Sequence, residues 1–163
     1  MEDLRFYDFE FNLLCIVPDV YDVCWELKFN GIGTFEAGII PDEEITNTIM
    51  NNEHIIVVQG NKQAIITEKF AENNKITIYG RTVNFMLSKR IVLPFDINKT
   101  YSETKGLKLI EKLVEQYFPE IEVEYDCEDE EMEFYRLVMY ELSEVICDIL
   151  DRMNGGHKLV YDI

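Results

Sequence analysis

The chain has 163 residues, enough for one domain or two small ones with a buried core. Apolar residues make up 47% of it and aromatic residues 12%, which indicates a globular protein and not a disordered one. The 32 acidic and 15 basic residues give a net charge of −17, and such a field repels nucleic acid phosphates and anionic membranes. We therefore expect neither a nucleic-acid partner nor a membrane partner.

Short runs of alternating or β-branched residues predict strands in the first half of the chain. The clearest alternation covers residues 21–29, where Tyr21, Val23 and Trp25 share one face and charged residues lie on the other. Further predicted strands, each bounded by turn residues, are Leu4–Asp8, Phe11–Ile16, Thr34–Ile40, Ile55–Val58, Ala64–Ile66 and Ile76–Tyr79. Pro41 and the acids that follow it predict a short helix through Met50.

The stretch from Ile55 to Pro94 has the most distinctive pattern. Its apolar runs are separated by Gly60-Asn61 and Asn73-Asn74, residues that suit tight hairpin turns. After Gly80 and Arg81, Thr82 can cap a short helix over Val83–Leu87, with Lys89 and Arg90 at its C-terminal end. A meander that ends in this way suggests a module for assembly more than a catalyst.

The second half shifts towards helix formers after a connector at Pro94–Thr100. Ser102 or Thr104 is predicted to cap a helix that runs to Tyr117, and Ile121–Tyr125 alternates as a strand does. Beyond an acidic loop, two interpretations stay open. One is a single long helix from Phe134 to Met153, and the other is a strand over Phe134–Tyr140 followed by a helix from near Ser143. In either case Gly155-Gly156 ends the helix, and a last strand is predicted over Lys158–Asp162.

The residues that could carry chemistry do not form a recognisable site. Glu120 to Glu133 holds nine carboxylates in fourteen residues but lacks the glycine that a calcium loop needs, so we expect a solvated or partner-binding face. His54 and His157 lack the partners of a catalytic triad, and Gly31 and Gly33 belong to a turn. We predict no catalytic, cofactor-binding or metal site, and no enzyme activity.

The four cysteines, which contain no Cys-x-x-Cys pair, indicate neither a disulfide scaffold nor a zinc site; they are Cys15, Cys24, Cys127 and Cys147. Cys24 lies within a predicted strand and Cys147 within an amphipathic segment, which predicts buried, unreactive thiols. Glu2 and Asp3 replace the basic start of a signal peptide, and no apolar run approaches the about 18 residues of a membrane span. These features predict synthesis in a reducing cytoplasm.

Several of these segments also match the pattern of a known family. They are Leu4–Asp8 followed by Asn12-Leu13-Leu14, the Trp25 strand running into Gly33–Glu36, the Ile65-Ile66 strand, Ile76–Arg81, and Leu87–Ile91. In this order they resemble the N-terminal region of tail-hub, or tail-tip, proteins of phages and prophages of Gram-positive bacteria. The likeness covers Met1 to Pro94, and more loosely the helix near Ser143–Asn154 with the strand after it.

The resemblance implies a structural role, acting by protein–protein assembly at the distal end of a phage or prophage tail tube, in the tail tip or baseplate hub. It implies a homo-oligomeric ring, commonly a trimer, that contacts tail tube or distal tail, tape-measure and baseplate proteins. It also implies a virion-tail location after synthesis in the bacterial host cytoplasm. Its first domain would be an antiparallel β-barrel whose end is closed by Val83–Leu87, with Arg81 and Arg90 in structural or interfacial roles.

The expected fold class is therefore α+β. Residues 1–95 are expected to form the β-rich, barrel-like hub domain, and residues 96–163 a small acidic α+β domain with 18 acids and 7 bases. The excess of acids in this second part supports an alternative function. In this alternative, the protein is a small acidic inhibitor or DNA mimic whose Glu120–Glu133 surface binds a basic host protein.

Overall fold

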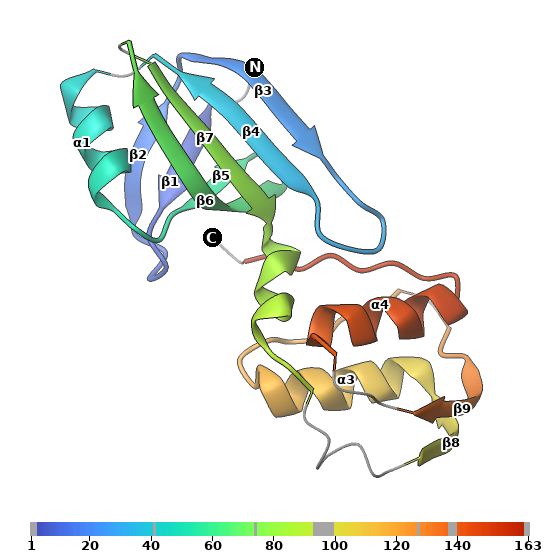
Figure 1. Ribbon diagram of the computed structural model, residues 1–163. Coiled ribbons are helices and arrows are strands. Elements are labelled where there is room, and N and C mark those ends of the chain that lie inside the picture. The colour runs from blue at the N-terminus through green and yellow to red at the C-terminus, as the bar shows by residue number, and fades with distance from the viewer. Residues whose placement is uncertain are drawn as a thin grey trace. The chain divides into compact units, whose positions relative to one another are not determined.

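The computed structural model describes residues 3–40, 42–73, 75–92, 100–126, 128–136 and 140–161. The fold is α+β, as expected, and the chain divides into two compact units (Figure 1). Unit 1 comprises Met1–Lys28, Ile32–Phe85 and Leu159–Ile163, and unit 2 comprises Phe29–Gly31 and Met86–Lys158. The domain boundary predicted near residue 95 lies at residues 93–99, outside the described residues, and it stays a prediction.

Unit 1 contains a seven-stranded antiparallel sheet, which confirms the strands predicted for the first half of the chain. Its strands are β1 (Leu4–Tyr7), β2 (Leu13–Val17), β3 (Val20–Glu26), β4 (Thr34–Ile39), β5 (Ile56–Gln59), β6 (Lys62–Glu72) and β7 (Lys75–Thr82). Their order in the sheet is β2-β1-β5-β6-β7-β4-β3. The long β6–β7 hairpin therefore forms the centre, and β2 and β3 form the edges.

The sheet is open, so the predicted β-barrel is wrong. Closure would require the two edge strands, β2 and β3, to lie side by side and exchange hydrogen bonds. Only Pro18 and Asp19 separate the end of β2 from the start of β3, and the two strands do not pair. A two-residue link can form a hairpin, but the favoured hairpin turns need a positive φ at their first residue, which the ring of Pro18 forbids, so β2 does not fold back beside β3.

The open sheet is nevertheless strongly curled. The indole N–H of Trp25 on β3 donates to the side-chain oxygen of Gln59 on β5 over 2.8 Å, although β4, β7 and β6 lie between these two strands in the sheet. The ammonium of Lys62 lies 6.0 Å from the centre of the same indole ring. This curl encloses an apolar core without closing the hydrogen-bonded ladder.

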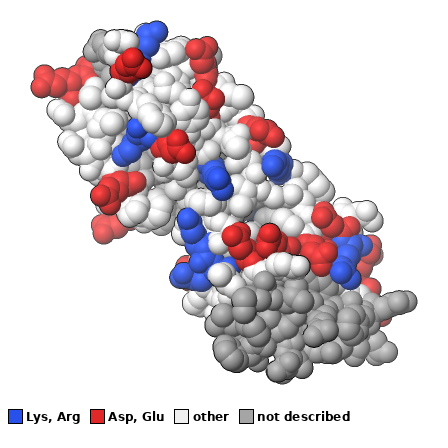
Figure 2. Space-filling view, viewed as in Figure 1, with Lys and Arg blue, Asp and Glu red and all other residues white. Residues whose placement is uncertain are grey.

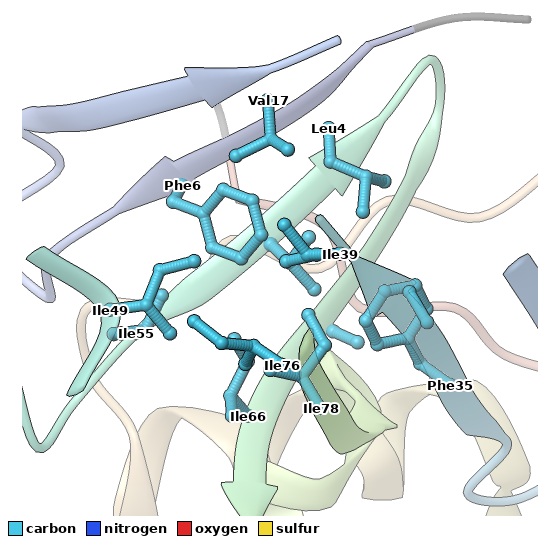
Figure 3. Packing of buried hydrophobic residues seen from close by; sticks show 13 residues of the cluster. Leu4, Phe6, Val17, Phe35, Ile39, Ile49, Ile55, Ile66, Ile76 and Ile78 are labelled. Atoms are coloured by element: carbon cyan, nitrogen blue, oxygen red, sulfur yellow. The ribbon is translucent and has the colours of Figure 1, made fainter. Parts of the chain in front are cut away.

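The core lies on the concave face of the sheet. Figure 3 shows Leu4, Phe6 and Val17 of β1 and β2 pointing toward Ile39, Ile76 and Ile78 of β4 and β7. The buried cluster comprises Leu4, Phe6, Val17, Phe35, Ala37, Ile39, Ile49, Ile55, Val57, Ala64, Ile66, Ile76 and Ile78. Period-2 alternation supplies most of these residues, as expected for strands with one buried face.

Helix α1 (Glu43–Asn51) adds Ile49 to this core and follows the short helix predicted from sequence. Asp42 caps its start by accepting the Ile45 N–H over 2.8 Å. At its other end, the ammonium of Lys69 on β6 donates to the carbonyls of Ile49 and Asn52. A cation at the last carbonyls offsets the negative end of the helix dipole.

Unit 2 contains two helices and a two-stranded sheet. Its elements are β8 (Thr100–Lys105), α3 (Gly106–Tyr117), β9 (Glu131–Arg136) and α4 (Leu142–Arg152), and the η1 segment (Val83–Lys89) leads into it from β7. β8 pairs antiparallel with β9, and α3 lies beside α4 (Figure 1). The buried residues of the two helices, such as Leu109 and Ile149, provide the apolar core of this unit.

Several predictions for the second half are corrected by the structure. Ser102 and Thr104 lie in β8 and not at a helix start, and the segment Ile121–Tyr125 is irregular and not a strand. Of the two interpretations left open, a strand followed by a helix is confirmed, because β9 precedes α4. The strand begins earlier than predicted, at Glu131, and of the predicted residues Phe134–Tyr140, residues 137–139 lie outside the described residues. The described part of the predicted last strand, residues 158–161, is irregular, and Asp162 lies outside the described residues.

Candidate protein-interaction surface

The convex face of the sheet, opposite the core, is called the outer face here. Across its β3-β4-β7-β6 half, the strand register places Tyr21, Gly38, Thr77 and Phe70 in one row. Tyr79 stands in the neighbouring row, opposite Glu36 and Glu68. This half of the outer face therefore presents aromatic rings among polar and acidic residues.

Tyr21 reaches the outer face because of a β-bulge in β3. The register shifts between Tyr21 and Cys24, and Asp22 adopts a positive φ of 52° at this point. Two bulge residues therefore oppose one residue of β4, so Tyr21 and Trp25 point to opposite faces, and the prediction that they share a face is wrong. Trp25 instead packs in the interior, 4.3 Å from the ring of Phe35.

Gly38 allows the Tyr21 ring to lie flat over β4. A Cβ at this position would come within 2.4 Å of two ring carbons of Tyr21. The ammonium of Lys75 lies 5.2 Å from the centre of the same ring, within the range of a cation–π contact. These neighbours hold Tyr21 in one place on an open sheet.

Phe70 and Tyr79 complete the aromatic group, and together with Tyr21 they are called the outer aromatic surface. The two rings meet edge to face with centres 5.9 Å apart. Phe70 is 56% exposed and Tyr79 36%. Exposed aromatic residues on a rigid support are typical of the parts of protein interfaces that contribute most of the binding energy.

The other half of the outer face carries the end of the chain. Residues 159–161, called the C-terminal strap, are held there by side chains of unit 1. The Gln63 side chain accepts the Tyr161 N–H over 2.7 Å and donates to the Tyr161 carbonyl over 2.8 Å. The side-chain oxygen of the buried Asn84 accepts the Leu159 N–H over 2.6 Å.

Phe11, in the turn between β1 and β2, packs against the strap with its ring centre 5.1 Å from that of Tyr161. The turn is built around Asp8, whose carboxylate accepts the N–H groups of Glu10 and Asn12 and the side-chain N–H of Asn12. The Asn12 side chain contributes most to lowering the pKa of Asp8. This network holds Phe11 at a positive φ of 63°.

Two isoleucines confirm that this part of the outer face is covered. Ile56 and Ile65 pair with each other and lie on the face opposite the core, yet they are only 1% and 7% exposed. Gln63 is two residues from Ile65 on the same strand, so its side chain stands on the same face. The hydrogen bonds of Gln63 thus place the strap beside these isoleucines.

Within unit 2, a second polar cluster surrounds Asn30 in the β3–β4 loop. The Asn30 amide donates to the Cys147 carbonyl over 2.9 Å and to the Asp151 carboxylate over 2.7 Å. Its carbonyl oxygen lies 2.9 Å from Nδ1 of His157, so this ring nitrogen carries the proton. Burial lowers the pKa of His157.

The other histidine and the cysteines occupy varied positions. His54 is exposed, with its ring centre 5.2 Å from that of Phe9. Cys15 and Cys147 are half-buried, and burial is the main cause that raises the pKa of Cys15 to about 11 and that of Cys147 above its ordinary value. Cys24 is exposed on the outer face, so its predicted burial is wrong, and Cys127 lies outside the described residues.

Two residues of the acidic run Glu120–Glu133 form hydrogen bonds that stabilise the start of α3, a role that the sequence did not suggest. The carboxylate of Asp129 accepts the Leu107 N–H over 2.7 Å at the start of α3, and the Glu130 carbonyl accepts the Gly106 N–H over 3.0 Å. The neighbouring acids are mostly exposed. Within the described residues, no group of His, Cys, Asp or Glu side chains is suited to hold a metal ion.

The two arginines singled out in the meander stack on aromatic rings. The Arg81 guanidinium lies 4.9 Å from the ring centre of Phe85, and the Arg90 guanidinium lies 5.1 Å from that of Phe118. Both arginines are exposed. In the view of Figure 2, basic side chains lie among acidic ones over the described surface, with uncharged residues between them.

Of the residues that form these surfaces, the sequence indicated Tyr21 as an aromatic strand residue but gave no functional weight to Gln63, Asn84 or Asn30. A weak signal was present for Asn84, a polar amide between the apolar residues Val83 and Phe85, but not for Gln63, which follows Lys62. A polar amide usually has a specific hydrogen-bond partner when it is buried. The partners of Gln63 and Asn84 lie 98 and 75 residues away, beyond the reach of local patterns.

No model of a known protein family matches the chain, and no curated protein matches it. Among solved structures, the fold is similar to that of the prophage tail protein gp18 from Listeria monocytogenes EGD-e, with a TM-score of 0.59 and 13% identity over 98% of this chain. It is also similar to that of the tail protein from Neisseria meningitidis MC58, with a TM-score of 0.60 and 14% identity over 96% of this chain. The chain spans about half of each neighbour, 48% and 47%. Within the described residues, no helix is long and apolar enough to cross a membrane.

Proposed function

We propose that this protein is a structural component of a phage or prophage tail and acts by assembly in the tail tip or baseplate hub. The observation that carries the proposal is the likeness of nearly the whole fold, across both units, to two tail proteins. In this role it forms a homo-oligomeric ring, a trimer, at the distal end of the tail tube. Its partners are tail tube or distal tail, tape-measure and baseplate proteins.

The outer aromatic surface is the part of the molecule that we propose for one of these contacts. Tyr21, Phe70 and Tyr79 are fixed on a sheet, so they lose little conformational entropy when a partner covers them. The exposed acids Glu36 and Glu68 stand in the row of Tyr79 and would form the polar rim that surrounds such a contact. This arrangement favours binding to another protein over a catalytic reaction.

The test is the mass of the purified chain, alone and mixed with the tail proteins encoded beside it, by size-exclusion chromatography with light scattering. We expect a trimer, or a complex with a tail protein, and we expect Phe70→Ser with Tyr79→Ser to weaken it. The matched control is Leu27→Ser, which changes an exposed apolar residue outside this surface. A chain that stays monomeric and binds no tail protein contradicts the proposal, and selective binding of a basic host protein would favour the acidic inhibitor.

A further inference from the structure

One row of the outer face combines an aromatic ring with two carboxylates. Tyr79 on β7 stands between Glu36 on β4 and Glu68 on β6, because the strand register pairs it with both residues. Directly opposed residues share a face, and neighbouring strands lie about 4.8 Å apart, so the two acids flank the ring on either side. All three residues are exposed, and together they are called the Tyr79 row.

The chain itself supplies no cation to this row. Within the described residues, no arginine or lysine forms an ion pair with Glu36 or Glu68, and none lies over the Tyr79 ring. Lys75 and Arg81 stand on the same strand and the same face as Tyr79, but each lies on another ring. The Lys75 ammonium is 5.2 Å from the ring centre of Tyr21, and the Arg81 guanidinium is 4.9 Å from that of Phe85.

The chemistry of the Tyr79 row is complementary to an arginine side chain. A guanidinium can stack on the electron-rich face of a tyrosine ring and donate N–H groups to carboxylates beside it. Phe70, whose ring centre is 5.9 Å from that of Tyr79, adds an exposed apolar surface for the aliphatic part of the same side chain.

Charge also selects the kind of protein that brings this arginine. A second copy of the chain carries a net charge of −17 and is repelled as a whole, whereas a basic surface is attracted by the same field. The occupant that fits is therefore a different protein with an exposed arginine.

We propose that the Tyr79 row binds an arginine on the surface of another tail protein. The guanidinium lies on the Tyr79 ring, and its N–H groups donate to the carboxylates of Glu36 and Glu68. The inference deepens the proposed function and rests on it for the identity of the partner as a tail protein. It gives the two acids the role of selecting the partner, because a surface without a cation would leave them uncompensated.

The first test uses a defined basic probe, a short fluorescein-labelled peptide in which arginine alternates with threonine, followed by fluorescence anisotropy. We expect saturable binding to the full-length chain that weakens as salt is added. The double variant Glu36→Gln with Glu68→Gln should weaken binding about fivefold or more. The matched control, Glu10→Gln with Glu53→Gln, changes the net charge equally at exposed acids outside the outer face and should have less than about a twofold effect.

Absence of saturable binding, or equal effects of the two double variants, overturns the inference, because the peptide would then respond only to net charge. Circular dichroism checks that each variant keeps its fold. A peptide with glutamine in place of arginine has no charge to pair and should bind at least about tenfold more weakly.

Substitution of Tyr79 tests the stacked position of the guanidinium. Tyr79→Phe keeps an aromatic ring and should bind the arginine peptide as the wild-type chain does. Tyr79→Leu keeps apolar bulk but removes the ring, and it should weaken binding about threefold. Equal binding by these two variants contradicts the stacking on the ring.

The second test uses the tail proteins encoded beside this chain. The variant Glu36→Gln with Glu68→Gln should weaken the complex with a tail protein about fivefold or more, and the control pair should not. A tail complex that the variant leaves unchanged overturns this inference while the tail function stands. Row-dependent peptide binding in a chain that binds no tail protein keeps the arginine site and contradicts the tail function. A homo-oligomer that the variant dissociates identifies a second copy as the occupant and overturns the choice of a different protein.

Discussion

Gly38 carries no side chain, and this absence determines where Tyr21 lies on the outer face. A methyl group there would come within 2.4 Å of two ring carbons, so the ring would have to leave its position over β4. Such local constraints place the side chains of the candidate surface, because the sheet alone fixes only which face a residue occupies.

We predict that Gly38→Ala destabilises the protein by about 1–3 kcal/mol, the usual cost of forcing an extra methyl group into a packed contact. Urea unfolding measures the loss. The double variant Tyr21→Ala with Gly38→Ala is the control, because removal of the ring removes the clash. If Gly38→Ala costs as much without the ring as with it, the assigned contact is wrong.

His157 should make stability depend on pH. Burial lowers its pKa in the folded chain below the ordinary value of 6.5, so the unfolded chain takes up the proton first as the pH falls. The contribution of His157 to the free energy of unfolding is fully present above pH 6.5, the pKa of the unfolded chain. It is lost as the pH falls from there through the lower pKa of His157 in the folded chain. Urea unfolding at neutral pH and at about pH 5 measures the change.

The variant His157→Gln should remove this part of the pH dependence, whereas His54→Gln, which changes the exposed histidine, should keep it. A pH dependence unchanged in His157→Gln would assign the effect to another group. The ring of His157 meets Asn30, so Asn30→Ala should also alter the profile.

Among the elements, α3 shows how a helix can begin without a local cap. Its N-cap residue, Lys105, has no side-chain cap bond, and the N–H of Leu107 is instead accepted by Asp129, 22 residues later. An acid near the positive end of the helix dipole is favourable. The acidic run thus contributes to folding as well as to net charge.

We predict that Asp129→Ala destabilises the protein by about 1 kcal/mol, the typical effect of losing an N-cap. Circular dichroism during thermal unfolding checks this, because α3 contributes to the helical signal. The neighbouring substitution Glu128→Ala, at an exposed acid, should change stability by less than about 0.5 kcal/mol. Equal effects of the two would mean that only net charge is involved.

Prediction from sequence succeeded where local patterns decide the structure and failed where distant residues do. Alternation identified β4 and β7, because one face of each is buried. Ser102 and Thr104 were wrongly predicted to cap a helix. The structure there is decided by the pairing of β8 with β9 and by the cap from Asp129, and both come from residues distant in the sequence. The bonds of Gln63 with the strap depend on tertiary structure in the same way.

For the whole molecule, the chain passes between the two units more than once, so each unit contains a short segment that continues directly from the other unit. Residues 29–31 belong to unit 2 but connect β3 to β4, strands of unit 1. If the β3–β4 pairing is lost, Asn30 loses its support, and with it the bonds to Cys147 and Asp151 on α4. We therefore expect the two units to unfold together.

Two signals separate the units in one experiment. Trp25 is the single tryptophan and lies in unit 1, whereas the helices α3 and α4 of unit 2 contribute most of the helical circular dichroism. In urea, the midpoints of the two signals should coincide for the wild-type chain. They should separate in Asn30→Ala, and separate midpoints already in the wild type would contradict the expectation.

The position of the strap at residues 159–161 also has a consequence for synthesis on the ribosome. The strands of unit 1 are made first, and all of residues 86–158 must follow before the strap exists. At about 5–20 residues per second, the Gln63 side chain therefore waits several seconds for the main-chain groups of Tyr161 that it binds. During that interval the donors and acceptors of Gln63 and Asn84 are open to a chaperone or to a neighbouring nascent chain.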